Sequence, residues 1–196
     1  IATVALRDGG AVIRGWGATH LLRAVPHVVC VRVCAPFELR QKRMMQRLAT
    51  ADAEKVAAEI RDNDEAHGAI VRRHFSVDFG DAEQYDLVLN TQRMSVAECV
   101  EQVLRVARSA AFAETPASRQ QLEDLALAWQ VRAALRHSPR TRAMRVSVKA
   151  VRACVSFQCA GYSAEDLDAM REVVASVPGV RSIDEARAME VRARYA

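Results

Sequence analysis

Two arginines on one predicted helix are the residues whose types and spacing most directly suggest chemistry. Arg40 and Arg43 lie three positions apart in the run that begins at Phe37. Residues at i and i+3 of a helix lie on the same side, so the two guanidinium groups can together grip a phosphate chain in bidentate fashion. The competing interpretation is a solvated helix face, which is the usual role of a charged stripe.

The histidines and cysteines predict no metal or nucleophile site. The five cysteines are scattered without a C-x-x-C pair, and four of them lie in apolar runs where a reduced thiol behaves as a small hydrophobic group. His20, His27, His74 and His137 share no metal-ligand spacing. We therefore expect thiols in the core and a reducing compartment.

The elements that must position the arginines alternate between strand and helix in the first half of the chain. Apolar and β-branched runs predict three strands, at 11–13, 27–33 and 85–90. Helical spacing and capping residues predict helices at 18–23, at 37–48 after Pro36, from Asp52 toward His74, and from Ser95 through 106. Strands separated by helices form parallel crossovers, so this half predicts an α/β layered domain.

The second half has a different order of elements. A helix is expected from 119 to 137, strands around 144–148 and 155–159, a helix at 167–177 capped by Ser163, and a last strand within 180–191. This order is α-β-β-α-β. The predicted division is a first domain at 1–112, a linker at 113–118 and a second domain at 119–196.

Several strings in the first half resemble the cytidylate kinase-like family. In chain order they are Ala11-Val12-Ile13-Arg14-Gly15-Trp16-Gly17-Ala18, Ala35-Pro36-Phe37-Glu38-Leu39-Arg40-Gln41-Lys42-Arg43-Met44, Asp64-Glu65-Ala66-His67, Asp78-Phe79-Gly80-Asp81 and Tyr85-Asp86-Leu87-Val88-Leu89-Asn90-Thr91. Each is weak alone. Five strings in the family's order, on the right types of element, are fairly specific, and the resemblance covers about residues 1 to 107.

The resemblance implies a three-layer P-loop kinase fold that transfers a phosphoryl group from ATP to a nucleoside monophosphate of the CMP type, with Mg²⁺ as a cofactor. Such a site holds two polyanions together, so it needs fixed positive charge. The resemblance assigns catalysis to Arg40 and Arg43. It assigns nucleotide or phosphate binding to Gly15, Gly17, Arg40, Arg43, Arg72 and Arg73, the last two on a closing lid.

Three departures from the family pattern leave the activity open. No G-x-x-x-x-G-K-[ST] loop or looser glycine-rich version occurs, so the predicted kinase-like domain lacks its P-loop part. Trp16 stands where an Arg is expected, and an indole cannot replace a guanidinium fork. His67 stands where the lid motif has an Arg. The alternatives are a fragment whose P-loop lies upstream, which the start of the chain in mid-pattern favours, and a degenerate kinase-like sensor or adaptor.

The second domain resembles a BON module. The resemblance rests on the helix 125–139, the V-x-V pattern at Val146 and Val148, the strand at Val155 and Phe157, and the G-V-x-x-I run that begins at Gly179. It implies binding of a ligand or a protein partner. Arg142, Arg145, Lys149 and Arg152 form a modest basic face there.

Composition limits the remaining classes of function. The net charge of +4 suits phosphate-bearing ligands, and an aromatic content of 5% without a basic-aromatic strip argues against nucleic acid as a partner. No run approaches the ~20 apolar residues of a membrane helix, and no signal peptide is recognisable. We expect a cytoplasmic protein. The sequence does not specify the nucleobase, the ligand of the second domain or the oligomeric state.

Overall fold

The computed structural model describes residues 1–6, 10–15, 17–159 and 161–184. Two compact units share the chain: Ile13–Thr115 form one, and Ile1–Val12 together with the segment from Pro116 onward form the other. We refer to the first as the kinase-like unit, only because its sequence strings resemble that family, and to the second as the C-terminal unit. The boundaries predicted at 112 and 119 stay a prediction. No helix among the described residues is both long and apolar enough to cross a membrane.

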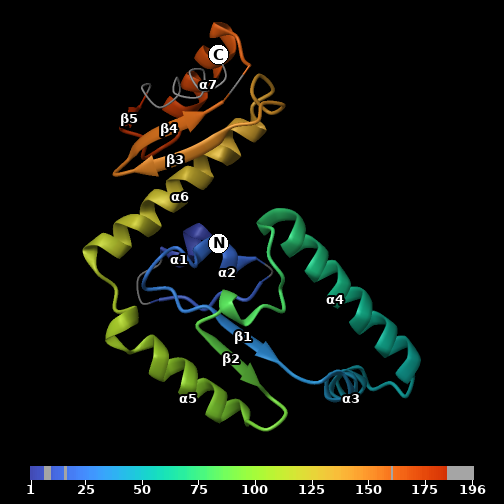
Figure 1. Ribbon diagram of the computed structural model, residues 1–196. Helices are drawn as coiled ribbons and strands as arrows, with labels where there is room; N and C mark the ends of the chain where they lie inside the picture. The colour runs from blue at the N-terminus through green and yellow to red at the C-terminus, as the bar shows by residue number, and fades with distance from the viewer. Residues whose placement is uncertain (7–9, 16, 160, 185–196) are drawn as a thin grey trace. The chain divides into compact units, whose positions relative to one another are not determined.

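The kinase-like unit contains two parallel strands and four α-helices (Figure 1). In chain order its elements are α2 (Ala18–Leu22), β1 (Val31–Cys34), α3 (Phe37–Leu48), α4 (Ala53–Phe75), the short 3₁₀ helix η1 (Ala82–Gln84), β2 (Leu87–Asn90), α5 (Val96–Ala107) and η2 (Ala110–Phe112). β1 pairs in parallel with β2, in a register that places Val31 opposite Leu87 and Cys34 opposite Asn90. The mixed α/β architecture is the predicted one.

Local signals determine the helix boundaries in this unit. α3 has the predicted limits, and Pro36 precedes it as the residue before the first turn. The Asp52 carboxylate accepts the Lys55 backbone N–H at 2.9 Å and so caps α4. Ser95 and Glu98 form a reciprocal capping box at the start of α5. The sequence therefore predicts where these helices begin.

The prediction of a strand at 11–13 is wrong. These residues have no regular structure, and the Val12 side chain is fully exposed. A three-residue apolar run becomes a strand only where a neighbouring strand takes up its hydrogen bonds, and none of the described residues does so here. β1 also begins at Val31 instead of position 27, because the Asp86 carboxylate accepts the Cys30 N–H at 2.7 Å.

The C-terminal unit has the predicted order α-β-β-α-β. It contains α1 (Ala2–Ala5), α6 (Pro116–His137), β3 (Ser147–Val151), β4 (Cys154–Gln158), α7 (Ala164–Ala175) and β5 (Ser182–Ile183). β3 and β4 form an antiparallel hairpin, and β5 pairs in parallel with β4. α6 begins at Pro116, three residues before the predicted start. The part of the last predicted strand beyond position 184 lies outside the described residues, and the resemblance to a BON module itself stays a prediction.

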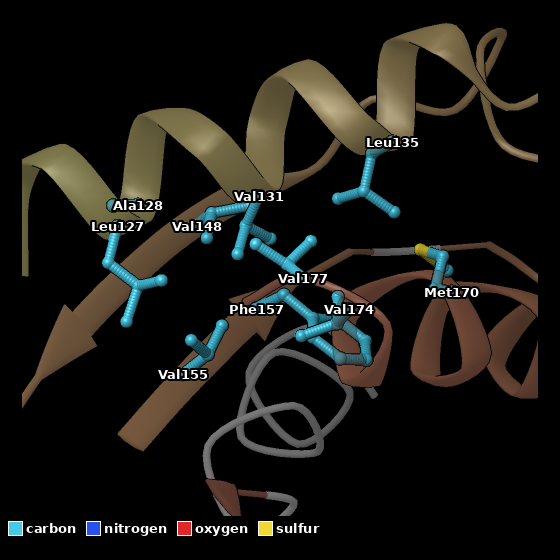
Figure 2. Close-up of a cluster of buried hydrophobic side chains, with 10 residues drawn as sticks. All are labelled: Leu127, Ala128, Val131, Leu135, Val148, Val155, Phe157, Met170, Val174 and Val177. Carbon is cyan, nitrogen blue, oxygen red and sulfur yellow. The ribbon is translucent and has the colours of Figure 1, made fainter. Parts of the chain in front are cut away.

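One face of this three-stranded sheet carries the core of the C-terminal unit (Figure 2). α6 contributes Val131 and Leu135, and α7 contributes Met170 and Val174. These side chains pack on the inward-facing strand residues, of which Val155 is completely buried. Alternate strand residues point to opposite faces, so the period of two in the sequence translates directly into this one-sided core.

Candidate phosphate-binding site

Arg40 lies on α3 and binds Asp64 on α4. Its two terminal guanidinium nitrogens donate to the two carboxylate oxygens of Asp64 at 2.8 and 2.7 Å. The side chains are 37% and 50% exposed, so this fork-to-fork pair is accessible to solvent. The hydrogen bonds from Arg40 hold the pKa of Asp64 below its usual value, and Asp64 raises the pKa of Arg40 in return. Arg40 is thus charged and makes a bidentate interaction, but its partner here is the Asp64 carboxylate and not a phosphate.

Arg43 on the same helix has a different partner. One terminal nitrogen donates to the Thr91 hydroxyl at 2.8 Å and the other donates to the Thr91 carbonyl at 2.9 Å. Thr91 directly follows β2, and its own backbone N–H donates to the Cys34 carbonyl at the end of β1. Arg43 is therefore fixed at the carboxyl ends of the two parallel strands, the edge where open α/β sheets bind ligands.

The two arginines do not meet on one partner in this structure. Arg40 is directed to α4 and Arg43 to the end of β2, although both lie on α3. The Nε atom of Arg40 is buried and makes no hydrogen bond with any described residue. The predicted joint grip of the two residues on a phosphate chain stays a prediction.

The two glycines of the bend, Gly15 and Gly17, differ in the space around them. A Cβ atom on Gly15 would meet nothing within 4 Å, whereas one on Gly17 would lie 2.8 Å from a ring carbon of Phe75. Gly17 has φ +83° and precedes α2, so its backbone also favours glycine. Because Phe75 is the last residue of α4, the bend lies against the end of the helix that carries Arg72 and Arg73.

The lid residues lie on the exposed side of α4. The Arg72 guanidinium folds back over Gly68, where a Cβ atom would be 3.0 Å from a terminal nitrogen of Arg72. Arg73 is exposed and has no hydrogen bond or ion pair among the described residues. His67 stacks on Phe79 with 6.2 Å between ring centroids. Burial lowers the pKa of His67 and Asp64 opposes that shift, so a neutral imidazole stands at this position. Trp16 lies outside the described residues.

Sequence reasoning missed the residues that hold these groups in place. Thr91 is identifiable afterwards, because the residue that follows one parallel strand lies beside the helix that follows its neighbour. Arg32 lies over the rings of Phe79 and Tyr85, at 5.4 and 5.9 Å from their centroids, and donates to the Gly80 carbonyl. No sequence spacing indicates this cluster, because the connector that carries Phe79 has no regular pattern.

Two cavities of this unit lie away from the predicted residues. One of about 140 Å³ is lined by Arg23, Cys30, Asp86 and neighbours, and burial there raises the pKa of the Cys30 thiol to about 11. The other, of about 620 Å³, is lined by α3 from Glu38 to Gln46 and by the connector from Ala49 to Ala53 at the start of α4. Neither is lined by Gly15, Gly17 or an arginine of the predicted site.

The described residues do not fit a magnesium or triphosphate site. They contain no group of three His, Cys, Asp or Glu side chains placed to hold a metal ion. The sequence has no glycine-rich phosphate loop that ends in Lys-Ser or Lys-Thr. What the geometry offers is positive charge beside the ends of two strands.

Comparison with known proteins finds matches to the first half of the chain. Residues 1–93 match the model of the Cytidylate kinase-like family. A cytidylate kinase of Methanothermobacter thermautotrophicus is 33% identical over 82 residues, which are 42% of this chain and 48% of that protein. A cytidylate kinase of Methanosarcina acetivorans is 25% identical over 90 residues, 46% of this chain and 49% of that protein. No solved structure matches this chain with significance.

The chain thus spans about half the length of the curated relatives that it matches. The matched region contains β1, α3, α4 and β2, and therefore Arg40, Arg43, Arg72 and Arg73. The family match ends at residue 93, before α6 and the three-stranded sheet of the C-terminal unit.

Proposed function

We propose that the protein transfers a phosphoryl group from ATP to a nucleoside monophosphate of the CMP type. The observation that carries the proposal is the position of Arg43 at the carboxyl ends of β1 and β2, within the region that matches the family model. The proposal concerns the complete gene product, because neither the donor phosphates nor Mg²⁺ has a fitting site in the described residues.

In this proposal Arg43 and Arg40 act on the phosphate of the acceptor. The fixed guanidinium of Arg43 contributes positive charge that needs no reorganisation when negative charge develops, which is how such sites lower a barrier. Arg40 presents a planar fork whose geometry suits phosphate as well as the carboxylate that it now binds. Gly17 brings the bend against the end of α4, so that Arg72 and Arg73 lie beside it.

A transfer assay on the complete gene product tests the proposal. The experiment measures transfer from radiolabelled ATP to CMP, UMP, AMP and dCMP. Transfer to CMP or a related monophosphate is expected, and Arg43→Gln is expected to lower kcat/KM about 100-fold. Arg47→Gln is the matched control, because Arg47 lies on the same helix, is exposed and has no partner among the described residues. No transfer to any monophosphate would refute the proposal.

The alternative of a non-catalytic sensor or adaptor has no observation of its own in its favour. The comparisons name kinases, and the family model covers residues 1–93. A second candidate function is therefore not argued for this unit.

A further inference from the structure

The outer face of the β3–β4 hairpin carries basic residues and, among the described residues, no acidic ones. Residues 138–162 contain five basic residues and no Asp or Glu. Along the segment that leads into β3, Val146 and Val148 pack into the core, whereas Arg145 and Lys149 are exposed. α6 and α7 both pack on the inner side of the sheet (Figure 2), so neither helix covers this outer face.

The hairpin turn adds two further cations to this face. Val151 pairs with Cys154, and the two residues between them, Arg152 and Ala153, have φ of +51° and +64°. Such two-residue turns normally use Asn or Gly, so the turn holds an arginine side chain at its tip at a conformational cost. Arg181 lies next to the turn, because its backbone N–H donates to the Ala153 carbonyl at 2.9 Å, and it is exposed. We call Arg145, Lys149, Arg152 and Arg181 the cationic face.

Several other basic residues of the same unit have partners, which the cationic face lacks among the described residues. Arg132 donates to the Val148 carbonyl at 3.0 Å, Arg140 pairs with Glu172 and Arg171 pairs with Asp168. The four side chains of the cationic face make no hydrogen bond or ion pair with any described residue. The acidic residues of α7 lie on the helical side of the sheet, whereas Asp184, directly after β5, shares the outward parity of Ser182.

The spacing and chemistry of the cationic face favour an extended polyanion. Arg145 and Lys149 are four residues apart, which is about 13–14 Å along an extended chain, so they match every second acidic side chain on one side of an extended peptide. Ser147 and Ser156 place hydroxyl groups between the cations. No described residue on this face is aromatic, since Phe157 points into the core, so bases have nothing to stack on.

From this charge complementarity we propose that the cationic face binds an extended acidic segment of a protein partner. Carboxylates of the segment pair with Arg145 and Lys149 along β3 and with Arg152 and Arg181 at the turn. The pairs stay accessible to solvent, so binding is weak for each pair, additive along the strand and sensitive to salt. This proposal is independent of the proposed phosphoryl transfer, which concerns the kinase-like unit.

Fluorescence anisotropy with a labelled oligoglutamate peptide tests the proposal on the full chain. The test variant is the triple substitution Arg145→Gln, Lys149→Gln, Arg152→Gln. The matched control removes the same charge from exposed, unpartnered positions of the kinase-like unit: Arg93→Gln, Arg105→Gln, Arg108→Gln. We expect the test variant to bind the peptide about tenfold more weakly, and the control to stay within about twofold of the wild type.

A second variant and two other probes complete the experiment. Lys149→Glu alone is expected to weaken peptide binding, because its backbone position in β3 is unchanged and only the sign of the charge is reversed. Equal losses in the test and control variants would overturn the proposal, since binding would then follow net charge alone. Tighter binding of oligothymidylate, or of vesicles that contain phosphatidylserine, than of the peptide would also overturn it, by showing another class of partner.

Discussion

The strands of the two units are covered to different extents. In the C-terminal unit Val155, Met170 and Val174 are completely buried, and the inward strand residues Val148, Val155 and Phe157 belong to one core with residues of α6 and α7. In the kinase-like unit Val33 of β1 is 63% exposed and Val88 of β2 is 42% exposed, although parallel strands are normally buried on both faces. α5 adds Val96, at 75% exposed, and Val100, at 50%.

The difference in strand exposure follows from which elements cover each sheet. The C-terminal unit covers one face of a short sheet with two helices that are its neighbours in sequence, and that is sufficient for a one-sided sheet. The kinase-like unit has strands of the two-sided type, but its described residues form two of them, so apolar residues that the sequence predicts as buried remain accessible. An apolar run in the sequence is therefore buried only where other helices or strands cover it.

The largest expected effect compares one valine from each unit on a helix. Val174→Ala in α7 removes a completely buried side chain and is expected to lower the free energy of unfolding by about 2 kcal/mol. Val100→Ala in α5 removes a half-exposed one and is expected to change it by at most about 0.5 kcal/mol. Urea unfolding followed by circular dichroism measures both. Equal losses would show that the core of the kinase-like unit extends to Val100.

The second effect lies inside the kinase-like unit, at its bend. Gly17→Ala places a Cβ atom against the Phe75 ring and forces a positive φ on alanine, so we expect a loss of about 1–3 kcal/mol in unfolding free energy. Gly15→Ala meets nothing within 4 Å and is expected to cost less than about 0.5 kcal/mol. Thermal unfolding distinguishes the two substitutions. Similar midpoints would contradict the close contact of the bend with the end of α4.

The third comparison uses the same capping device in both units. Ser163→Ala removes the capping box of α7 and is expected to lower the global unfolding free energy by about 1 kcal/mol, because α7 is part of a closed core. Ser95→Ala removes the box of α5, where only Cys99 is buried. There the loss should appear as faster hydrogen exchange within the first turn. Hydrogen exchange monitored by mass spectrometry measures both effects. Loss of protection throughout the protein in both variants would contradict the predicted difference between α7 and α5.

The smallest effect concerns the Arg40–Asp64 pair and its dependence on pH. Arg40 lowers the pKa of Asp64, so the pair stabilises the fold above the unfolded-state pKa of about 3.9, and this contribution disappears as pH falls through the lower folded-state pKa. Both groups are more than a third exposed, so Asp64→Asn is expected to cost less than about 1 kcal/mol at neutral pH and nothing in strong acid.

Asp62→Asn is the control for that measurement. Asp62 is exposed on the same helix and has no partner among the described residues, so its substitution should give no pH-dependent difference from the wild type. Urea midpoints across the acid range supply the data. A difference between Asp64→Asn and the wild type that does not change with pH would contradict a role for the Asp64 charge.

Much of the fold and part of the candidate site were predictable. The limits of α3, the caps at Asp52, Ser95 and Ser163 and the order α-β-β-α-β follow from local signals that act within a few residues. The strand predicted at 11–13 failed, because pairing depends on a neighbour that the run itself does not specify. The candidate arginines were identifiable by type and spacing, but their partners Asp64 and Thr91 were not.

The sequence by itself determined the helix ends, the inward period of two in β3 and β4, and the placement of Arg40 and Arg43 on one helix. Each of these depends on hydrogen bonds and side-chain spacing within a few residues of the chain. Only the tertiary structure decided that Arg40 turns to Asp64, that Arg43 is fixed at Thr91, and that Gly17 lies under Phe75. Those contacts join residues 24, 48 and 58 positions apart, and only the packing of α3, α4 and the two strands brings them together.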